Sequence, residues 1–315
     1  MQSTGIGYGK TILFGEHFVV YGLPAIASAI SDHTIATVEK AGPGTGITLI
    51  DNRPEIRGYK ETKKGEIARE IEALSKHFKL DERKSPLKIT LSGGLECASG
   101  IGASAALASS IARAIGQHFS LNLTNEQVNE AAYAAETAGS GTPSGIDNTC
   151  STYGCMLVFE KNMQGGSNKI ELLAVKKPLD IVLASTGITQ ETKGVVDEVR
   201  AQKENDPKKF DAIFSEYRKV LDEAVPALKN GDKRKVGALM DRNQELLRKI
   251  NVSCPEIEKI IAIARSNGAL GAKLTGTGRG GLVICLAENK AAQERIAKAL
   301  EKAGYGARKT SLGGE

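Results

Sequence analysis

The sequence has no tryptophan, and aromatic residues make up only 4% of its 315 residues. Proteins that bind single-stranded nucleic acid stack bases on aromatic side chains, so this composition disfavours such a surface. The net charge is only +5, from 42 lysines and arginines against 37 acids, and no purely basic run concentrates it. Solvated helix faces explain this charge better than a nucleic-acid patch does. We therefore expect no nucleic-acid partner.

Metal-binding cysteine and histidine patterns are also missing. The five cysteines form no CxxC pair and the four histidines form no HExxH motif, so a zinc site is not expected. Scattered cysteines of odd number are typical of reduced thiols in a cytosolic protein. No run reaches the roughly 18 apolar residues that span a bilayer, and the N-terminus lacks a signal-peptide pattern. The sequence predicts a cytoplasmic protein with no membrane partner.

Apolar periodicity predicts strands and helices without a regular βαβ alternation, which is typical of the α+β class. Strands are predicted at residues 8–14, 34–39, 46–50, 87–91, 156–159, 170–175, 181–184, 271–274, 282–286 and 306–310. Helices are predicted at 64–78, 104–119, 125–137, 192–202, 208–230, 233–250, 256–266 and 291–303. Thr124 and Gln127 have the spacing of a capping box at the start of the third helix. A polar segment at 161–169 is a predicted loop, and near it we divide the chain into domains of residues 1–170 and 171–315.

Glycine is in surplus: 35 of the 315 residues, or 11%, are glycine, whereas about 7% is usual. One glycine-rich segment, residues 93–106 (GGLECASGIGASAA), follows a predicted strand and opens a predicted helix. Backbone N–H groups at such a helix start bind phosphate. The segment lacks the Gly-Lys-Ser/Thr of a Walker loop and the later acid of a dinucleotide site. A tight turn is the alternative, in which Ser104 is a helix cap rather than a Mg²⁺ ligand.

A second polar segment, residues 136–148 (ETAGSGTPSGIDN), carries two acids around a loop with few apolar residues. Glu136 ends an alanine-rich helix, so its side chain is a candidate for partial burial. Asp147 follows a rigid Pro-Ser-Gly turn, which suits a catalytic base or a metal ligand. The alternative is that Asp147 caps the next short helix.

Two further segments lie near the ends of the chain. Residues 9–17 (GKTILFGEH) form a predicted strand with Lys10 inside it, and residues 273–281 (KLTGTGRGG) form a glycine-rich turn between two strands. A lysine in a half-buried strand usually reaches solvent, but its ammonium group could also pair with an acid or a phosphate. A lone histidine such as His17 is more often structural than a ligand, and the turn could be a plain hairpin.

Taken in order, these segments resemble the GHMP kinase superfamily, and most closely its mevalonate kinase branch. The likeness rests on residues 10–22 (KTILFGEHFVVYG), 100–106 (GIGASAA), 142–148 (TPSGIDN), 241–247 and 273–281, and it covers nearly the full length. It implies a GHMP kinase-like two-lobed α+β fold with an N-terminal mixed α/β lobe and a C-terminal ferredoxin-like lobe. The active site would lie in the cleft between the lobes.

The resemblance also implies a role for each matching residue. Asp147 would be the catalytic carboxylate and Lys10 its cationic partner, while Ser104 and Glu136 would hold Mg²⁺. The substrate would contact Glu16, His17 and Thr192, the last by a looser alignment. The ATP phosphates would contact Glu96, Cys97, Ala98, Ser99, Gly100, Ile101, Gly102, Ala103, Ser104 and Ala105. We also expect the Cys97 thiol to be exposed in this loop.

The implied activity is ATP-dependent phosphorylation of the 5-hydroxyl of mevalonate in isoprenoid precursor synthesis. Another small-metabolite kinase, such as a phosphomevalonate kinase, is one alternative. A non-catalytic protein that binds nucleotide or metabolite is a second, and a nicotinamide-dependent enzyme is a weaker third. Arg279 and Ala103 depart from the family pattern, and Arg279 could contact phosphate, contact carboxylate or point to solvent. The oligomeric state is open, with a homodimer as one choice.

Overall fold

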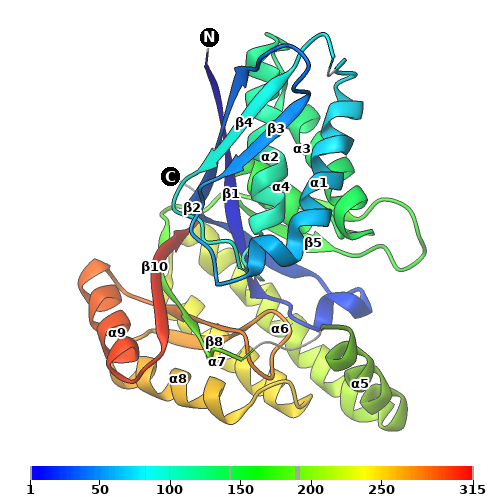
Figure 1. Cartoon of the computed structure of the whole chain (residues 1–315). Helices are drawn as coiled ribbons and strands as arrows, with labels where there is room; N and C mark the ends of the chain where they lie inside the picture. The colour runs from blue at the N-terminus through cyan, green and yellow to red at the C-terminus, as the bar shows by residue number, and fades with distance from the viewer. Residues whose placement is uncertain (1, 82, 99, 142, 189–191, 314–315) are drawn as a thin grey trace. The chain divides into compact units, whose positions relative to one another are not determined.

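The computed structural model of the chain describes residues 2–81, 83–98, 100–141, 143–188 and 192–313 (Figure 1). The strands within these residues are β1 (Ser3–Phe14), β2 (Ala25–Lys40), β3 (Ile47–Asp51), β4 (Leu87–Ser92), β5 (Met156–Glu160), β6 (Lys169–Leu173), β7 (Leu179–Ser185), β8 (Gly271–Thr275), β9 (Leu282–Leu286) and β10 (Gly306–Leu312). The helices are the 3-10 helix η1 (Phe18–Tyr21), α1 (Tyr59–His77), α2 (Ala103–His118), α3 (Asn125–Ser140), α4 (Ile146–Tyr153), α5 (Thr192–Asn205), α6 (Pro207–Asn230), α7 (Lys233–Lys249), α8 (Pro255–Ser266) and α9 (Lys290–Lys302). The α+β prediction is confirmed. None of the helices described is long and apolar enough to cross a membrane.

The chain forms two compact units. The first contains the residues up to Lys10 and Ala29–Gly154, and the second contains Thr11–Ser28 and the residues from Cys155 onward. Strands β1 and β2 each contribute residues to both units. The predicted domain limits of 1–170 and 171–315 stay a prediction.

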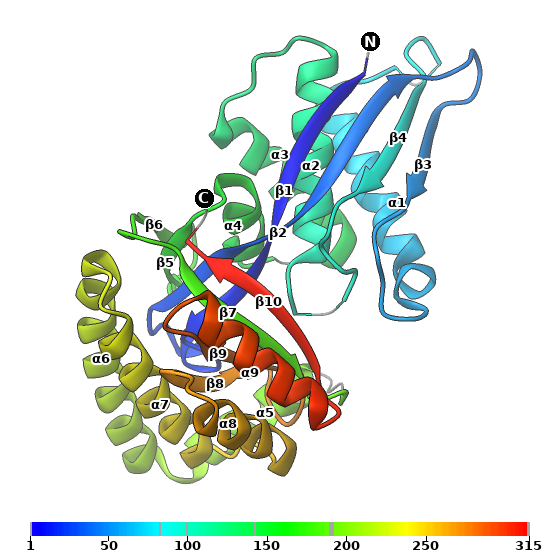
Figure 2. The same ribbon diagram turned by 90° about the vertical axis from the view of Figure 1, so that its left-hand side faces the viewer.

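In the first unit, α1, α2 and α3 lie on one face of the strands β1 to β4 (Figures 1 and 2). Strand β2 pairs antiparallel with β4, from Ile35 opposite Ser92 to Lys40 opposite Leu87, and β3 pairs with β4 in parallel. Alternate residues of β4 are buried, as expected for a strand with one face on a core. The helices contribute mainly alanine to that core, so they can pack close to the sheet.

Glycine allows β1 and α2 to approach closely. A β-carbon on Gly7 would lie 2.1 Å from the carbonyl oxygen of Ala106, which is far inside van der Waals contact. The first turns of α2 are therefore held against β1, and the backbone N–H of Lys10 donates to the carbonyl of Ile101 at 2.8 Å. This packing places Lys10 beside the N-terminus of α2.

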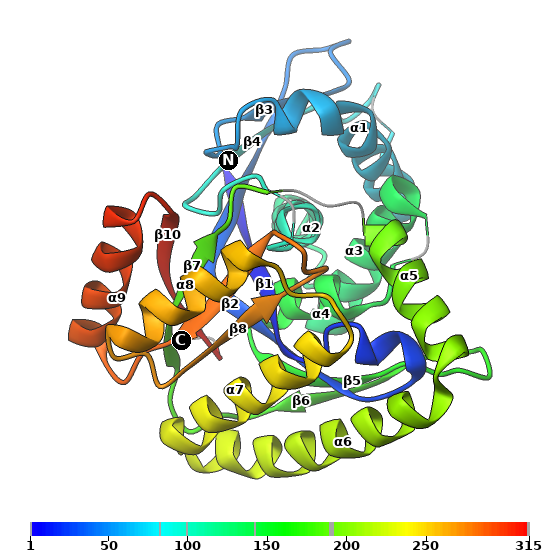
Figure 3. The same cartoon turned by 90° about the horizontal axis from the view of Figure 1, so that it is seen from below.

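In the second unit, β10, β7, β9 and β8 form an antiparallel sheet in that order. Along the chain, β7 is followed by helices and then by β8, β9, α9 and β10. This strand and helix order is that of the ferredoxin-like fold, so the expectation for the C-terminal lobe is confirmed. Helices α7, α8 and α9 pack on this sheet (Figures 2 and 3).

Several helix starts follow directly from the sequence. The predicted capping box is confirmed, since Thr124 Oγ1 accepts from the N–H of Gln127 and the Gln127 side chain accepts from the N–H of Thr124. Asp206 caps α6 by accepting from the N–H of Lys209, with Pro207 at the first helical position. Such caps satisfy N–H groups that have no partner inside the helix.

The first two strands are longer than predicted. Strand β1 begins at Ser3 rather than at residue 8, and β2 covers Ala25–Lys40 rather than 34–39. The first six residues of β2 are all buried, so they show no alternation between polar and apolar side chains. Strand periodicity cannot detect such a segment. The predicted loop at 161–169 lies between β5 and β6, although its last residue belongs to β6.

Candidate active site

A glycine turn precedes the N-terminus of α2 in the first unit. Gly102 is the N-cap of α2, and its φ of 73° lies in the left-handed region that favours glycine. A β-carbon there would lie 3.2 Å from the backbone nitrogen of Lys10, so the position is also crowded. Because glycine has no side chain to cap the helix, the first N–H groups of α2 stay available to an anion.

A cavity of about 250 Å³ lies at this helix N-terminus. Ser104, Glu136 and Asp147 all line it, so the structure brings together the predicted metal ligands and the predicted base. The cavity is also lined by four further residues of the predicted phosphate loop, Ala98, Gly100, Gly102 and Ala103. The remaining residues predicted for this loop do not line it: Glu96, Cys97, Ile101 and Ala105. Ser99 lies outside the described residues.

Asp147, which lines the cavity, forms an ion pair with Lys10. Lys10 Nζ lies 2.9 Å from Asp147 Oδ1, and the exposed fractions of the two side chains are 10% and 37%. Asp147 is in the first turn of α4, after a left-handed Gly145 with a φ of 90°. Burial alone would lower the pKa of Lys10, but the charge and hydrogen bond of Asp147 outweigh it and raise that pKa. Lys10 therefore stays protonated beside the carboxylate.

Glu136 is buried close to the end of α3. Burial, together with the nearby carboxylates of Asp147 and Glu70, raises the pKa of Glu136 to about 8. A site with several carboxylates and little solvent favours a bound cation, because the cation removes their mutual repulsion.

Glu70 and Arg53 are two of the residues lining the cavity that were not predicted from the sequence. The Ser104 hydroxyl donates to Glu70 Oε1 at 2.5 Å, and burial raises the pKa of Glu70 to about 7. Arg53 donates to both oxygens of Asp51, at 3.0 and 2.7 Å, and to the carbonyl of Ala103 at 3.0 Å. Arg53 thus fixes the first residue of α2.

The sequence gives only a weak indication that Glu70 and Arg53 belong to a site. Glu70 lies three residues after Ile67 and four before Leu74, which puts it on the apolar face of α1. That helix is otherwise rich in charge, so Glu70 resembles one more solvated side chain. Arg53 stands in an irregular segment between β3 and α1, where no periodicity applies.

The expected exposure of Cys97 is wrong. Cys97 is fully buried, because its backbone pairs with the segment before α1. Its N–H donates to the carbonyl of Pro54 at 2.7 Å, and its carbonyl accepts from the N–H of Ile56 at 3.1 Å. These bonds hold the residue away from the surface of the loop.

We expect thiol labelling to follow this burial. Cys155 and Cys254 are partly exposed, whereas Cys97, Cys150 and Cys285 are buried, and burial raises the pKa of Cys285 to about 12. Brief iodoacetamide treatment of the folded protein should therefore modify Cys155 and Cys254 first, as read by peptide mass spectrometry. Modification of Cys97 or Cys285 at a rate equal to that in urea would contradict the placement.

In the second unit, Glu16 and His17 of the segment 15–17 contact the glycine-rich segment 273–281. Glu16 Oε1 accepts from Lys273 Nζ at 2.5 Å, and both side chains are 0% exposed. His17 Nε2 lies 2.6 Å from the carbonyl oxygen of Thr277, and burial lowers the pKa of His17. His17 has a φ of 62°, a strained conformation for a residue with a side chain. The carboxylate of Glu16 thus serves a buried ion pair, and its contact with substrate stays a prediction.

Two further residues singled out in the sequence of this unit are Arg279 and Thr192. Arg279 donates to Glu198 Oε2 at 2.5 Å and to the carbonyl of Asn251 at 3.1 Å, so of the three alternatives it contacts a carboxylate. Thr192 is the first residue of α5, but its side chain lies outside what the structure describes.

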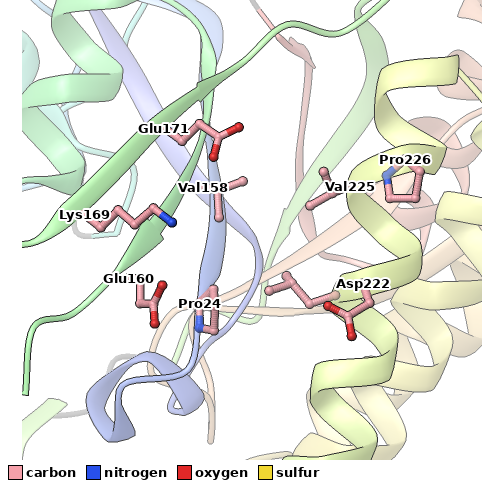
Figure 4. A pocket seen from close by; sticks show the side chains of 9 residues that line it. Pro24, Val158, Glu160, Lys169, Glu171, Asp222, Val225 and Pro226 are labelled. Atoms are coloured by element: carbon pink, nitrogen blue, oxygen red, sulfur yellow. The ribbon is translucent and has the colours of Figure 1, made fainter.

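A second cavity, of about 350 Å³, lies within the second unit (Figure 4). The strands β5 and β6 contribute Glu160, Lys169 and Glu171 to its wall, and α6 contributes Asp222. It contains none of the residues predicted for catalysis or binding. We therefore place the candidate chemistry in the cavity at α2.

Comparison with known proteins gives matches along most of the chain. The model for the GHMP kinases N terminal domain matches residues 66–155, and the model for the GHMP kinases C terminal region matches residues 224–306. The chain is 33% identical over 318 residues to the mevalonate kinase of Pyrococcus furiosus, covering 94% of this chain and 91% of that relative.

Solved structures agree with these matches. The crystal structure of L. major mevalonate kinase in complex with R-mevalonate superposes with a TM-score of 0.93 at 38% identity, covering 99% of this chain and 96% of that one. The mevalonate kinase of Methanococcus jannaschii superposes with a TM-score of 0.82 at 26% identity, with 99% and 98% coverage.

Proposed function

Because this chain belongs to the GHMP kinase family, we propose that it transfers the γ-phosphoryl group of ATP to the 5-hydroxyl of (R)-mevalonate. The products are 5-phosphomevalonate and ADP, and the reaction is a step of isoprenoid precursor synthesis. The observation that carries the proposal is the Lys10–Asp147 ion pair, whose carboxylate lines a cavity at a helix N-terminus. The relatives with the same overall fold that are named mevalonate kinases support the choice of acceptor.

In this proposal Asp147 accepts the proton of the acceptor hydroxyl. The hydroxyl oxygen then forms a bond to the γ-phosphorus, and the bond from that phosphorus to the bridging oxygen of ADP breaks. Lys10 lies beside this carboxylate and offsets the negative charge that moves toward the acceptor oxygen. Phosphoryl transfer depends mainly on positioning and charge neutralisation, and both residues are held by packed elements.

We propose that the N-terminus of α2 binds the phosphates of ATP. Its first N–H groups have no side-chain cap, and the glycines at 100 and 102 leave room for close approach. The positive end of the helix dipole favours the phosphate charge. Arg53, which anchors the carbonyl of Ala103, keeps this end rigid.

We also propose that Ser104 and Glu136 hold Mg²⁺. The fit rests on the donors present, which are a hydroxyl and buried carboxylates, the oxygen ligands that Mg²⁺ prefers. Among the described residues no group of three His, Cys, Asp or Glu could hold a metal alone, but Mg²⁺ in kinases needs only one or two carboxylates besides substrate phosphates. When bound, the ion would neutralise charge on the ATP phosphates.

The acceptor contacts proposed for the second unit are His17 and Thr192, with Glu16 positioning the segment. His17 is held by its bond to Thr277, and the buried Glu16–Lys273 pair fixes the residues on either side. A rigid segment suits selection of one small acceptor, because specificity needs groups held in place.

An ADP-release assay over several acceptors tests the proposed function. With Mg-ATP we expect turnover with mevalonate and at least about tenfold lower kcat/KM with phosphomevalonate, homoserine or galactose, a discrimination within reach of ordinary pocket contacts. Turnover with phosphomevalonate alone would favour the alternative kinase. The absence of ADP release with every acceptor would favour a non-catalytic homologue and would contradict the proposal.

A further inference from the structure

A buried carboxylate stands in the middle of the otherwise charged and solvated helix α1. Glu70 is 1% exposed, while its neighbour Glu72 on the same helix is solvated and pairs with Lys76. Burying a carboxylate is costly unless its oxygens are hydrogen-bonded. The partners of Glu70 therefore show what the residue does.

Only one of the two carboxylate oxygens of Glu70 has a hydrogen-bond partner among the described residues. Glu70 Oε1 accepts from the Ser104 hydroxyl at 2.5 Å, whereas Glu70 Oε2 is buried and has no hydrogen-bond partner in the part of the chain described. A group retained only for stability would be fully bonded. An unused buried oxygen in a cavity that also holds Ser104, Glu136 and Asp147 indicates a functional role instead.

The surrounding residues are arranged to hold this side chain. A β-carbon on Gly139 would lie 2.6 Å from Glu70 Oε1, so α3 makes room for the carboxylate by having a glycine inside the helix. Arg69, the preceding residue, donates to the carbonyls of Ala138 and Gly139 at 2.9 and 2.8 Å. These bonds tie α1 to the end of α3 and place Glu70 over Ser104.

We propose that Glu70 is a positioning residue for the divalent cation of the reaction, acting through the Ser104 hydroxyl. A serine hydroxyl has one proton and two lone pairs. Because Glu70 takes the proton, the lone pairs of Ser104 Oγ are left to face the cation. This inference rests on the proposed cation site at Ser104 and Glu136 and adds the group that orients one of its ligands.

Metal ligands are commonly oriented by such an outer partner, whose loss weakens metal binding by about 10–100-fold. The test is the dissociation constant of Mn²⁺ in the presence of a non-hydrolysable ATP analogue, read by electron paramagnetic resonance. We expect Glu70→Ala to raise this constant by about 10–100-fold. The affinity for the analogue without metal should be unchanged. Glu72→Ala, on the exposed face of the same helix, is the matched control and should match the wild type.

Three further variants keep the proposal testable if Glu70→Ala folds poorly. Glu70→Gln retains an oxygen that can accept from Ser104, so its Mn²⁺ affinity should stay near that of the wild type. Gly139→Ala adds a methyl group against Glu70 Oε1 and should weaken Mn²⁺ binding although alanine favours a helix. In a Ser104→Ala background, Glu70→Ala should have no further effect, because the group it orients is gone.

Two sets of results would overturn the proposal. Wild-type Mn²⁺ affinity in folded Glu70→Ala would overturn the proposal. The proposal would also be overturned if Glu70→Gln bound Mn²⁺ as weakly as Glu70→Ala and if the effects of Glu70→Ala and Ser104→Ala on Mn²⁺ affinity were additive. These two results together would mean that Glu70 is itself a ligand of the cation. Failure of the wild type to phosphorylate mevalonate would refute the proposed function and leave these binding measurements unaffected, so the two failures can be told apart.

Discussion

Replacing Asp147 with asparagine should lower kcat by about 10²–10⁴-fold, the range that a general base contributes. Asparagine has nearly the same shape, but its amide oxygen cannot take a proton from the acceptor hydroxyl. The side chain is partly exposed and is not a core element, so the fold should be retained. Nucleotide affinity should also be retained, because the proposed phosphate site is the N-terminus of α2.

The measurement is a steady-state assay of Asp147→Asn beside a nucleotide titration of the same sample. Asp211→Asn is the matched control, since Asp211 is an exposed residue of α6, and it should leave kcat unchanged. A kcat within a few-fold of the wild type for Asp147→Asn would refute the assignment of the base. Equal loss of nucleotide binding would show that the residue has a different role.

Replacing Lys273 with methionine should lower the free energy of unfolding by about 3–5 kcal/mol, the usual cost of breaking a buried ion pair. The change leaves the Glu16 carboxylate in a fully buried position without its cation. Burial already raises the pKa of Glu16 and lowers that of Lys273, which shows how unfavourable each separate charge is there. The loss should appear in urea unfolding monitored by circular dichroism.

A double-mutant cycle separates the pair from other effects of the substitution. Glu16→Gln with Lys273→Met removes both charges, so the double variant should be more stable than the sum of the two single losses predicts. Lys298→Met breaks the exposed pair with Glu294 and should leave the free energy of unfolding close to that of the wild type. Additive losses at Glu16 and Lys273 would mean that the two groups do not stabilise one another.

The resemblance predicted that Lys10 and Asp147 act together in catalysis, and the structure shows that the two side chains form an ion pair. Lys10 and Asp147 are far apart along the chain, yet Gly7 and Gly102 draw β1 and the start of α2 together. Such glycines can be recognised in a sequence as an excess, but their contacts cannot. The glycine turn before α2 was predictable from the sequence, and its binding of phosphate stays a proposal.

The partners of buried charges were not predictable. Glu70 belongs to a helix rich in lysine and glutamate, and its burial and its contact with Ser104 became apparent only in the structure. Lys273 was assigned to a strand next to a turn, and its pairing with Glu16 joins residues that are distant in the sequence. Cys97 was misplaced for the same reason, because its burial depends on backbone bonds to a remote segment.

The most direct test of the proposed function is the identity of the product. Incubation with Mg-ATP and (R)-mevalonate, followed by phosphorus and carbon nuclear magnetic resonance, should show ADP and a phosphomonoester in equal amounts. The carbon signal coupled to phosphorus should be C5. Phosphate on the tertiary hydroxyl, or ADP formed together with free phosphate and unchanged mevalonate, would contradict the assignment of this chain as a kinase for the 5-hydroxyl.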